Sequence, residues 1–163
     1  MVHVRAFAVG DGEGLARAID AVCAEGQWMR TARFEPDAAW EHALAYPDCP
    51  CRLLLVAEDG GDIVGWCRAF PADAGEAAVT IGLGLLPSHR DQGIGTAMLR
   101  QALDWARRVG YRQARLTTRE DNARAIHVFQ RCGFRVAGPA DDGLLSMTCD
   151  LVDLGFPEQG GRS

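Results

Sequence analysis

Residues 85–97 read LLPSHRDQGIGTA, which is an apolar strand end, a proline, a polar turn with two glycines and the start of a helix. The first N–H groups of a helix lack intrahelical acceptors and carry the positive end of the helix dipole, so such a turn suits a phosphate. Gly93 and Gly95 have no Cβ atoms that would keep a pyrophosphate away from these amides. The stretch therefore predicts a strand, an anion-binding turn and a helix.

This turn alone does not identify a family, because the glycines of an ordinary turn can serve helix packing only. Two common nucleotide motifs do not fit. The third glycine of the dinucleotide fingerprint is missing after Gly95, and the chain contains no Gly-Lys-Ser/Thr for a nucleoside triphosphate.

The elements on either side of the turn alternate between strand and helix patterns. Residues 94–109 place apolar side chains on one half of a helical wheel and charged ones on the other, as expected for a helix packed on a sheet. Further strands are predicted at 2–9, 53–57, 63–70, 78–86, 115–118, 134–137 and 144–151, and further helices at 11–25, from Pro36 and at 122–132. We predict an α/β (mixed α+β) fold, with a mixed, mostly antiparallel twisted sheet of about seven strands and about four helices on both faces.

Length and charge limit the function classes. The 163 residues, 48% of them hydrophobic, predict a single domain at 1–154 and a fraying tail at 155–163. A net charge of −5 provides no basic field for nucleic acid or an anionic membrane, so a small-molecule or peptide partner fits better. The sequence shows neither a signal peptide nor an apolar run long enough for a transmembrane helix, which predicts a soluble, cytoplasmic protein.

Six cysteines are an even number, but a chain of this length does not need disulfides, and we expect reduced thiols. Cys49-Pro50-Cys51, with His42 upstream, is the one pattern that suggests a metal. It lacks the two-residue gap of zinc knuckles and a second Cys or His pair, so we predict no metal site.

Two segments resemble the GNAT superfamily of N-acetyltransferases. Arg90, Gly93 and Gly95 match its pyrophosphate signature Arg/Gln-x-x-Gly-x-Gly/Ala, and residues 118–134, TREDNARAIHVFQRCGF, look like its second signature, Asn-x-x-Ala-Ile-x-x-Tyr-x-x-x-Gly-Phe. The close resemblance covers about residues 81–138. It implies acetyl-coenzyme A as cofactor, bound in a cleft where the fourth and fifth strands, near 80–86 and 114–118, splay apart.

The resemblance also assigns residues to the cofactor. The pyrophosphate would lie on the turn, and the pantetheine arm would pair with strand backbone and meet Asn122. The Leu85 N–H would polarise the thioester carbonyl as charge develops on its oxygen. The implied cofactor-binding residues are Leu85, Leu86, Arg90, Asp91, Gln92, Gly93, Ile94, Gly95, Thr96, Asn122 and Phe129.

Two catalytic roles are less well marked. Direct attack needs a neutral amine, whereas an alkyl ammonium has a pKa of about 10.4, so a base or a water chain should help. Glu76, at the start of the fourth strand, is the candidate, although it can equally be an exposed charge at a strand edge. Phe129 stands where many members have a tyrosine that protonates the leaving thiolate, and phenylalanine cannot donate that proton.

For the acceptor, the resemblance points to the loop between the first two helices and to late loops of the chain. Trp28 and Phe34 suggest an apolar lid, or ordinary packing under a loop. Trp66 and Arg68 share one face of their strand, and Arg68 would pair a substrate carboxylate or remain solvated.

The sequence thus predicts an N-acetyltransferase that moves an acetyl group from acetyl-coenzyme A to a primary amine of a small molecule or peptide. The alternative is a weakly active or inactive acyl-coenzyme A sensor on the same fold, which the phenylalanine at 129 makes plausible. The acceptor's identity and a homodimeric state stay open.

Overall fold

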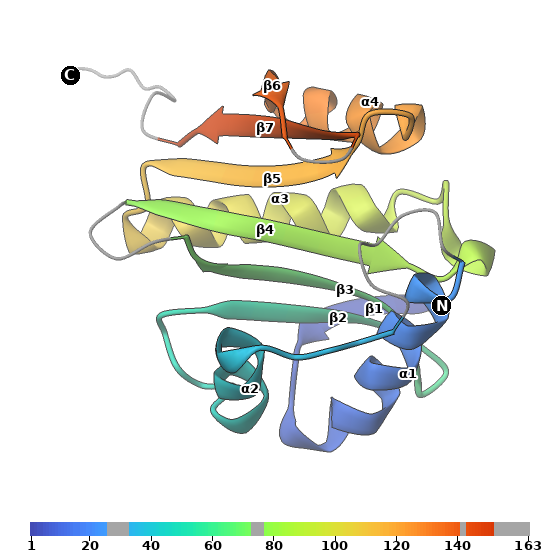
Figure 1. Cartoon of the computed structure of the whole chain (residues 1–163). Helices are drawn as coiled ribbons and strands as arrows, with labels where there is room; N and C mark the ends of the chain where they lie inside the picture. Colours follow the sequence, from blue (N-terminus) through green and yellow to red (C-terminus); the bar gives the residue numbers. More distant parts are fainter. Residues whose placement is uncertain (26–32, 73–76, 141–142, 152–163) are drawn as a thin grey trace.

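Seven strands form one mixed sheet with helices on both faces (Figure 1). The computed structural model describes residues 1–25, 33–72, 77–140 and 143–151. In chain order the elements are β1 (Val2–Ala6), η1 (Val9–Asp11), α1 (Gly12–Cys23), α2 (Ala38–Ala45), β2 (Leu53–Asp59), β3 (Asp62–Pro71), β4 (Ala78–Leu85), η2 (Pro87–His89), α3 (Ile94–Val109), β5 (Gln113–Arg119), α4 (Ala123–Arg131), β6 (Arg135–Pro139) and β7 (Leu144–Asp150).

The strand order is β1-β2-β3-β4-β5-β7-β6, and every neighbouring pair is antiparallel except β4 and β5. That parallel pair is short, because Ala78, Val79 and Thr80 face Gln113, Ala114 and Arg115 and the ladder then stops. The predicted fold class, including the separation between the fourth and fifth strands, is confirmed.

Two apolar clusters lie on opposite faces of the sheet. Alternate residues of β2 and β3 point to opposite sides, so Leu55 and Cys67 join the cluster beneath α3, whereas Val56 and Trp66 join the one beneath α1 and α2. Met98 of α3 is completely buried. The sheet is therefore covered by packed helices on both sides.

Local signals set the helix ends. Glycines in the left-handed region bound α3, with φ of 83° at Gly93 and 109° at Gly110. Asp37 caps α2 by accepting a hydrogen bond from the Trp40 N–H at 3.0 Å.

The first turn of α1 differs from the usual capping pattern. Asp11 precedes the helix but accepts hydrogen bonds from the Ala8 N–H and from both terminal nitrogens of Arg5, at 2.8–2.9 Å. Arg5 also donates to Glu58 on β2 at 2.7 Å. The Arg5 guanidinium holds the pKa of Asp11 below its usual value, so this ion pair joins β1, β2 and the entry to α1.

The expectation of reduced thiols is wrong for one pair, because Cys49 and Cys51 form a disulfide. The expectation rested on chain length, because a chain of this size does not need disulfides for stability. Chain length does not tell whether two cysteines only two residues apart are bonded. The Cys67 thiol is completely buried, and burial raises its pKa to about 12.

The described part of the chain contains no helix that is long and apolar enough to span a bilayer. The predicted tail, 155–163, lies outside the described residues.

Candidate active site

A cavity of about 630 Å³ lies where β4 and β5 separate. Its walls are residues 81–85 of β4, residues 115–118 of β5, the turn before α3 and the inner side of α4. The volume falls in the usual range of small-molecule sites. The gap in the sheet thus provides a site with strand backbone on both sides.

The N-terminus of α3 faces this cavity. Gly93 is its N-cap residue, and no side chain caps the helix among the described residues. Gly93, Gly95 and Thr96 all line the cavity. The N–H groups of the first turn therefore point their partial positive charge at this end of the cavity, as an anion site requires.

Glycine occurs at the two positions of the turn, 93 and 95, for different physical reasons. Gly93 needs glycine for its backbone, since its φ is 83°. Gly95 has no positive φ, and a Cβ there would lie 3.5 Å from the Leu83 side chain, an ordinary van der Waals contact. Protein packing does not require glycine at 95, so the space left there is available to a ligand that approaches the helix amides. The turn therefore fits a pyrophosphate.

Arg90 holds this turn in place. Its two terminal nitrogens donate to both carboxylate oxygens of Glu25 at 2.9 and 2.7 Å, and its Nε donates to the Leu85 carbonyl at 3.0 Å. Both partners of this ion pair are mostly buried. The guanidinium thus ties the turn to the ends of α1 and β4, while the side chain still borders the cavity.

An ion pair crosses from the turn to α4. Asp91, whose φ is 61°, forms an ion pair with Arg124, with Oδ1 and Nε 3.2 Å apart, and both residues line the cavity. More than half of each side chain is exposed, so the pair contributes little to stability. It places one anion and one cation where the turn and α4 face each other.

The backbone of Leu85 points into the gap between the strands. The Leu86 N–H bonds the Val64 carbonyl of β3 at 2.9 Å. Because N–H groups alternate in direction along a strand, the Leu85 N–H faces the β5 side. In the described ladder, β5 pairs with no residue of β4 beyond Thr80, so the Leu85 amide faces the cavity and not a strand.

Asn122 and Phe129 stand on the α4 side of the cavity. The Asn122 side chain caps α4 by accepting from the Ala125 N–H at 3.3 Å. Phe129 is 7% exposed and its ring centre lies 6.0 Å from that of Phe134, so it both packs in the core and borders the cavity.

Two glycines of β4 make room for large side chains of β3. A Cβ on Gly84 would overlap the Trp66 ring, and one on Gly82 would lie 3.0 Å from the Arg68 Nε. Trp66 and Arg68 therefore lie flat over β4 and line the end of the cavity nearest α1 and α2.

Arg68 is held between aromatic rings. Its guanidinium carbon lies 5.7 Å from the Trp40 ring centre and 5.1 Å from that of Phe70. Burial lowers the pKa of Arg68, and the negative charge of Asp37 opposes this effect. The alternative of a freely solvated arginine is excluded: a cation is fixed at this end of the cavity.

Comparison with known proteins identifies the family. Residues 17–134 match the sequence profile described as the acetyltransferase (GNAT) family. The chain belongs to the GNAT family. Both segments that resembled GNAT signatures lie inside this match, so the resemblance is confirmed.

Among curated proteins, the chain is 32% identical over 138 residues to a mycothiol acetyltransferase of Sanguibacter keddieii, covering 82% of this chain and 43% of that protein. It is 34% identical over 91 residues to a streptothricin acetyltransferase of Streptomyces lavendulae, covering 56% and 48%. The chain thus spans less than half the length of these two relatives.

Solved GNAT structures share the fold. A GNAT acetyltransferase from Streptococcus pneumoniae superposes with a TM-score of 0.78 at 18% identity, covering 93% of this chain and 99% of that one. A phosphinothricin acetyltransferase from Sinorhizobium meliloti, solved with acetyl-coenzyme A, gives 0.75 at 20% identity, covering 92% and 88%.

The structure brings most of the predicted GNAT site residues to one cavity. Those that line it are Leu85, Arg90, Asp91, Gly93, Gly95, Thr96, Asn122, Phe129, Phe34, Trp66 and Arg68. Three others do not: Leu86 is half-buried, Ile94 is the first residue of α3 and is buried in the core, and the Gln92 side chain donates to the Ser88 carbonyl. Glu76 and Trp28 lie outside the described residues.

Sequence reasoning missed several polar residues of the GNAT cavity. Thr117, Thr118 and Ser146 line it from β5 and β7. The resemblance already placed residues 114–118 beside the cofactor cleft, so the threonines of that strand could have been predicted as lining residues. Glu35 also lines the cavity, and its position next to Phe34 could have predicted this.

Proposed function

We propose that this chain is an acetyl-coenzyme A dependent N-acetyltransferase that acetylates a primary amine of a small molecule or peptide by direct attack. The observation that carries the proposal is the uncapped N-terminus of α3, with its open space at Gly95, facing a cavity of about 630 Å³ between β4 and β5. Family membership supports the same reaction.

Different residues of the cavity would bind different parts of acetyl-coenzyme A. The amides of the first turn of α3, with Gly93 and Thr96, receive the pyrophosphate. The pantetheine amides pair with the edge of β4 that β5 leaves, and Asn122 borders the arm from the other side. The Leu85 N–H donates to the thioester oxygen as negative charge develops there.

In the reaction, the amine nitrogen forms a bond to the acetyl carbonyl carbon and the carbon–sulfur bond breaks. The amine loses one proton to a base, and the departing thiolate gains one. Glu76 remains the proposed base, and Glu35 is a second carboxylate that borders the cavity. Since a free thiol has a pKa near 8.5, the thiolate leaves without the tyrosine that Phe129 replaces, and hydroxyls of Thr117 and Ser146 line the same space.

The acceptor would enter at the end lined by Trp66, Arg68 and Phe34. These side chains offer an apolar surface beside one fixed cation, which suits an amine that also carries a carboxylate. Streptothricin, for which one relative is named, is a useful first acceptor to assay.

The test is release of free coenzyme A from acetyl-coenzyme A across a panel of amines that contains streptothricin, polyamines, amino acids and matching amino acid amides. We expect amine-dependent thiol release, and a preference for carboxylate-bearing acceptors that Arg68→Gln removes. Glu35→Gln and Glu76→Gln should be compared in the same assay over a range of pH, since the true base shifts the rate to higher pH when it is removed.

Phe129 favours one second candidate, a sensor that binds acetyl-coenzyme A without turning it over. Binding by calorimetry together with no thiol release for any amine would establish the sensor. No binding at all would refute both functions.

A further inference from the structure

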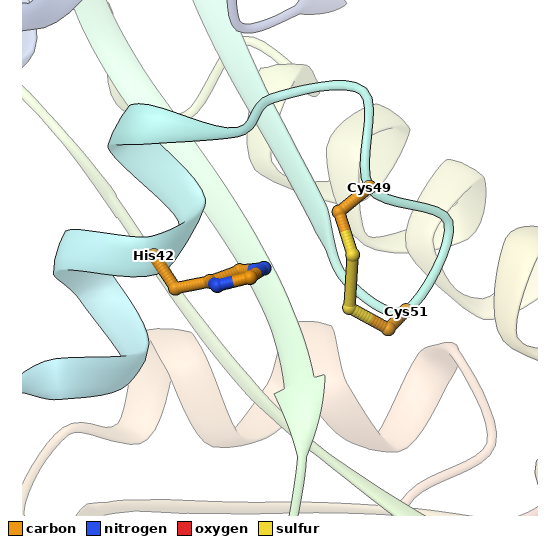
Figure 2. A group of neighbouring side chains, drawn as sticks. All are labelled: His42, Cys49 and Cys51. Atoms are coloured by element: carbon orange, nitrogen blue, oxygen red, sulfur yellow. A yellow bond between two sulfur atoms is a disulfide. The ribbon is translucent and has the colours of Figure 1, made fainter.

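The segment between α2 and β2 carries a second group of reactive side chains outside the acetyl-transfer cavity. Cys49 and Cys51 form a disulfide with Cα atoms 5.5 Å apart. A ring nitrogen of His42 lies within 4.8 Å of both sulfur atoms. Figure 2 shows the His42 ring extending from α2 toward the disulfide.

The disulfide contributes little to holding the fold. A cross-link stabilises mainly by restricting the unfolded chain, and the effect grows with the length of the loop that it closes. Here the cysteines are two residues apart. Other bonds already fix the segment, because the Cys49 N–H donates to the Tyr46 carbonyl at 3.1 Å and the Tyr111 hydroxyl donates to the Cys51 carbonyl at 3.4 Å.

The surroundings of the sulfurs favour reaction. Arg52 Nη1 donates to the Cys51 sulfur at 3.2 Å, so a guanidinium stands beside an atom that becomes anionic when the bond is reduced. A neighbouring cation stabilises the thiolate, which is the reactive form of cysteine. The Arg52 guanidinium is itself positioned by the Phe70 ring, 5.9 Å away.

His42 completes the group. Its Nε2 is buried and has no hydrogen-bond partner in the described part of the chain. An unsatisfied ring nitrogen near two sulfurs can accept a proton from one thiol and return it to a leaving one. Cys49 and Cys51 are both half-exposed, so a small reagent can reach them, whereas Cys67 is completely buried with a raised pKa.

The same three side chains are ligand types for a thiophilic metal ion. Two features count against a resident metal: the sulfurs are bonded to each other, and the Arg52 guanidinium beside Cys51 would repel a cation.

We propose that Cys49 and Cys51 form a dithiol–disulfide redox site that exchanges with low-molecular-weight thiols and disulfides, with Arg52 stabilising the Cys51 thiolate and His42 transferring the proton. This inference does not depend on acetyl transfer.

The exchange is balanced in two steps. In the reduced protein, the Cys51 thiolate attacks one sulfur of a small disulfide, forms a mixed disulfide and releases one small thiolate. The Cys49 thiolate then attacks the Cys51 sulfur, closes the Cys49–Cys51 bond and releases the second. Two electrons pass from the protein to the small disulfide, and the two thiol protons end on the released small thiols.

The experiment equilibrates the full chain with buffers of reduced and oxidised glutathione, traps thiols by alkylation and identifies them by mass spectrometry of the peptide containing both cysteines. We expect the pair to interconvert reversibly with the glutathione ratio. Cys132→Ser, which removes another half-exposed cysteine, is the matched control and should leave the titration unchanged.

Single variants test the roles. With Cys49→Ser, the remaining Cys51 should add one glutathione faster than Cys49 does in Cys51→Ser. Arg52→Gln should slow exchange by about threefold, because a thiolate fraction about tenfold smaller is partly offset by greater nucleophilicity. His42→Gln should slow the exchange rate without moving its equilibrium.

Three results would overturn the proposal. One is a pair that stays oxidised under excess dithiothreitol, or stays reduced at every glutathione ratio. Another is unfolding of both single cysteine variants in reductant, which would make the bond structural. The third is one Zn²⁺ per reduced chain that survives gel filtration and prevents exchange.

Discussion

Gly95→Ala is expected to stabilise the protein without ligand and to weaken its binding of acetyl-coenzyme A. Gly95 is the second residue of α3, its φ is not positive, and an added Cβ would make an ordinary contact 3.5 Å from Leu83. Replacing glycine by alanine in a helix contributes about 0.5–1 kcal/mol. For a chain of this size, that raises the melting temperature by roughly 1–4 °C.

The ligand effect has the opposite sign. A methyl group at 95 occupies the space through which a pyrophosphate would reach the amides of α3, and a tenfold loss of affinity corresponds to about 1.4 kcal/mol. The rise in melting temperature on adding acetyl-coenzyme A should therefore be smaller in Gly95→Ala than in the wild type. Calorimetric titration measures the affinity, and thermal melts with and without ligand measure both signs.

The matched control is Gly12→Ala. Gly12 is the first residue of α1, with φ of −54°, and an added Cβ would meet no atom within 4 Å. Gly12 does not line the cavity, so its alanine variant should show the stabilisation and an unchanged affinity. If Gly95→Ala lowers the melting temperature of the free protein, or binds acetyl-coenzyme A as tightly as the wild type, the glycine serves packing and the phosphate site is misplaced.

Three further changes test other parts of the structure. Phe129→Tyr should fold, bind acetyl-coenzyme A and release thiol at least as fast as the wild type, because the ring borders the cavity; unfolding with loss of binding would place it in a closed core. Glu25→Gln removes the charged partner of Arg90 and should lower the free energy of unfolding in urea by about 1–3 kcal/mol and raise the KM for acetyl-coenzyme A. An unchanged KM would show that the ion pair does not position the turn. The pKa of Asp11 is lowered in the folded protein by Arg5, so its contribution, about 1–2 kcal/mol, is present above roughly pH 4 and is lost as the pH falls below that value. The stability difference between wild type and Asp11→Asn should shrink on acidification, and a constant difference would contradict this.

The fold was largely predictable because each element carries its own local signal. Alternation marked the strands, one apolar face marked α3, and Gly93 and Gly110 marked its ends. Asp11 shows the limit of such signals: it precedes α1 as a helix cap does, but its carboxylate accepts from Arg5 of β1 and from the Ala8 N–H, and it caps no amide of α1.

The candidate site was predictable where it depends on backbone and less so where it depends on tertiary contacts. Gly93 follows from the helix start, whereas the ion pair of Arg90 joins residues 65 positions apart and leaves no local pattern. Arg68 illustrates the same limit, since one of its aromatic neighbours, Trp40, comes from α2 and only the other, Phe70, lies on its own strand. The Cys49–Cys51 bond was missed because spacing alone does not distinguish two thiols from a disulfide.

The short ladder between β4 and β5 divides the sheet into two blocks, β1–β4 and β5–β7. Three residue pairs join the blocks directly, whereas β5 and β7 are joined by seven. Amide hydrogen exchange occurs through cooperative opening of such units, so the two blocks should lose protection separately when the cleft is empty. A ligand that pairs with the free edge of β4 would join the two blocks, so that their amides exchange at one common rate. This change in hydrogen exchange would detect ligand binding even when no reaction takes place.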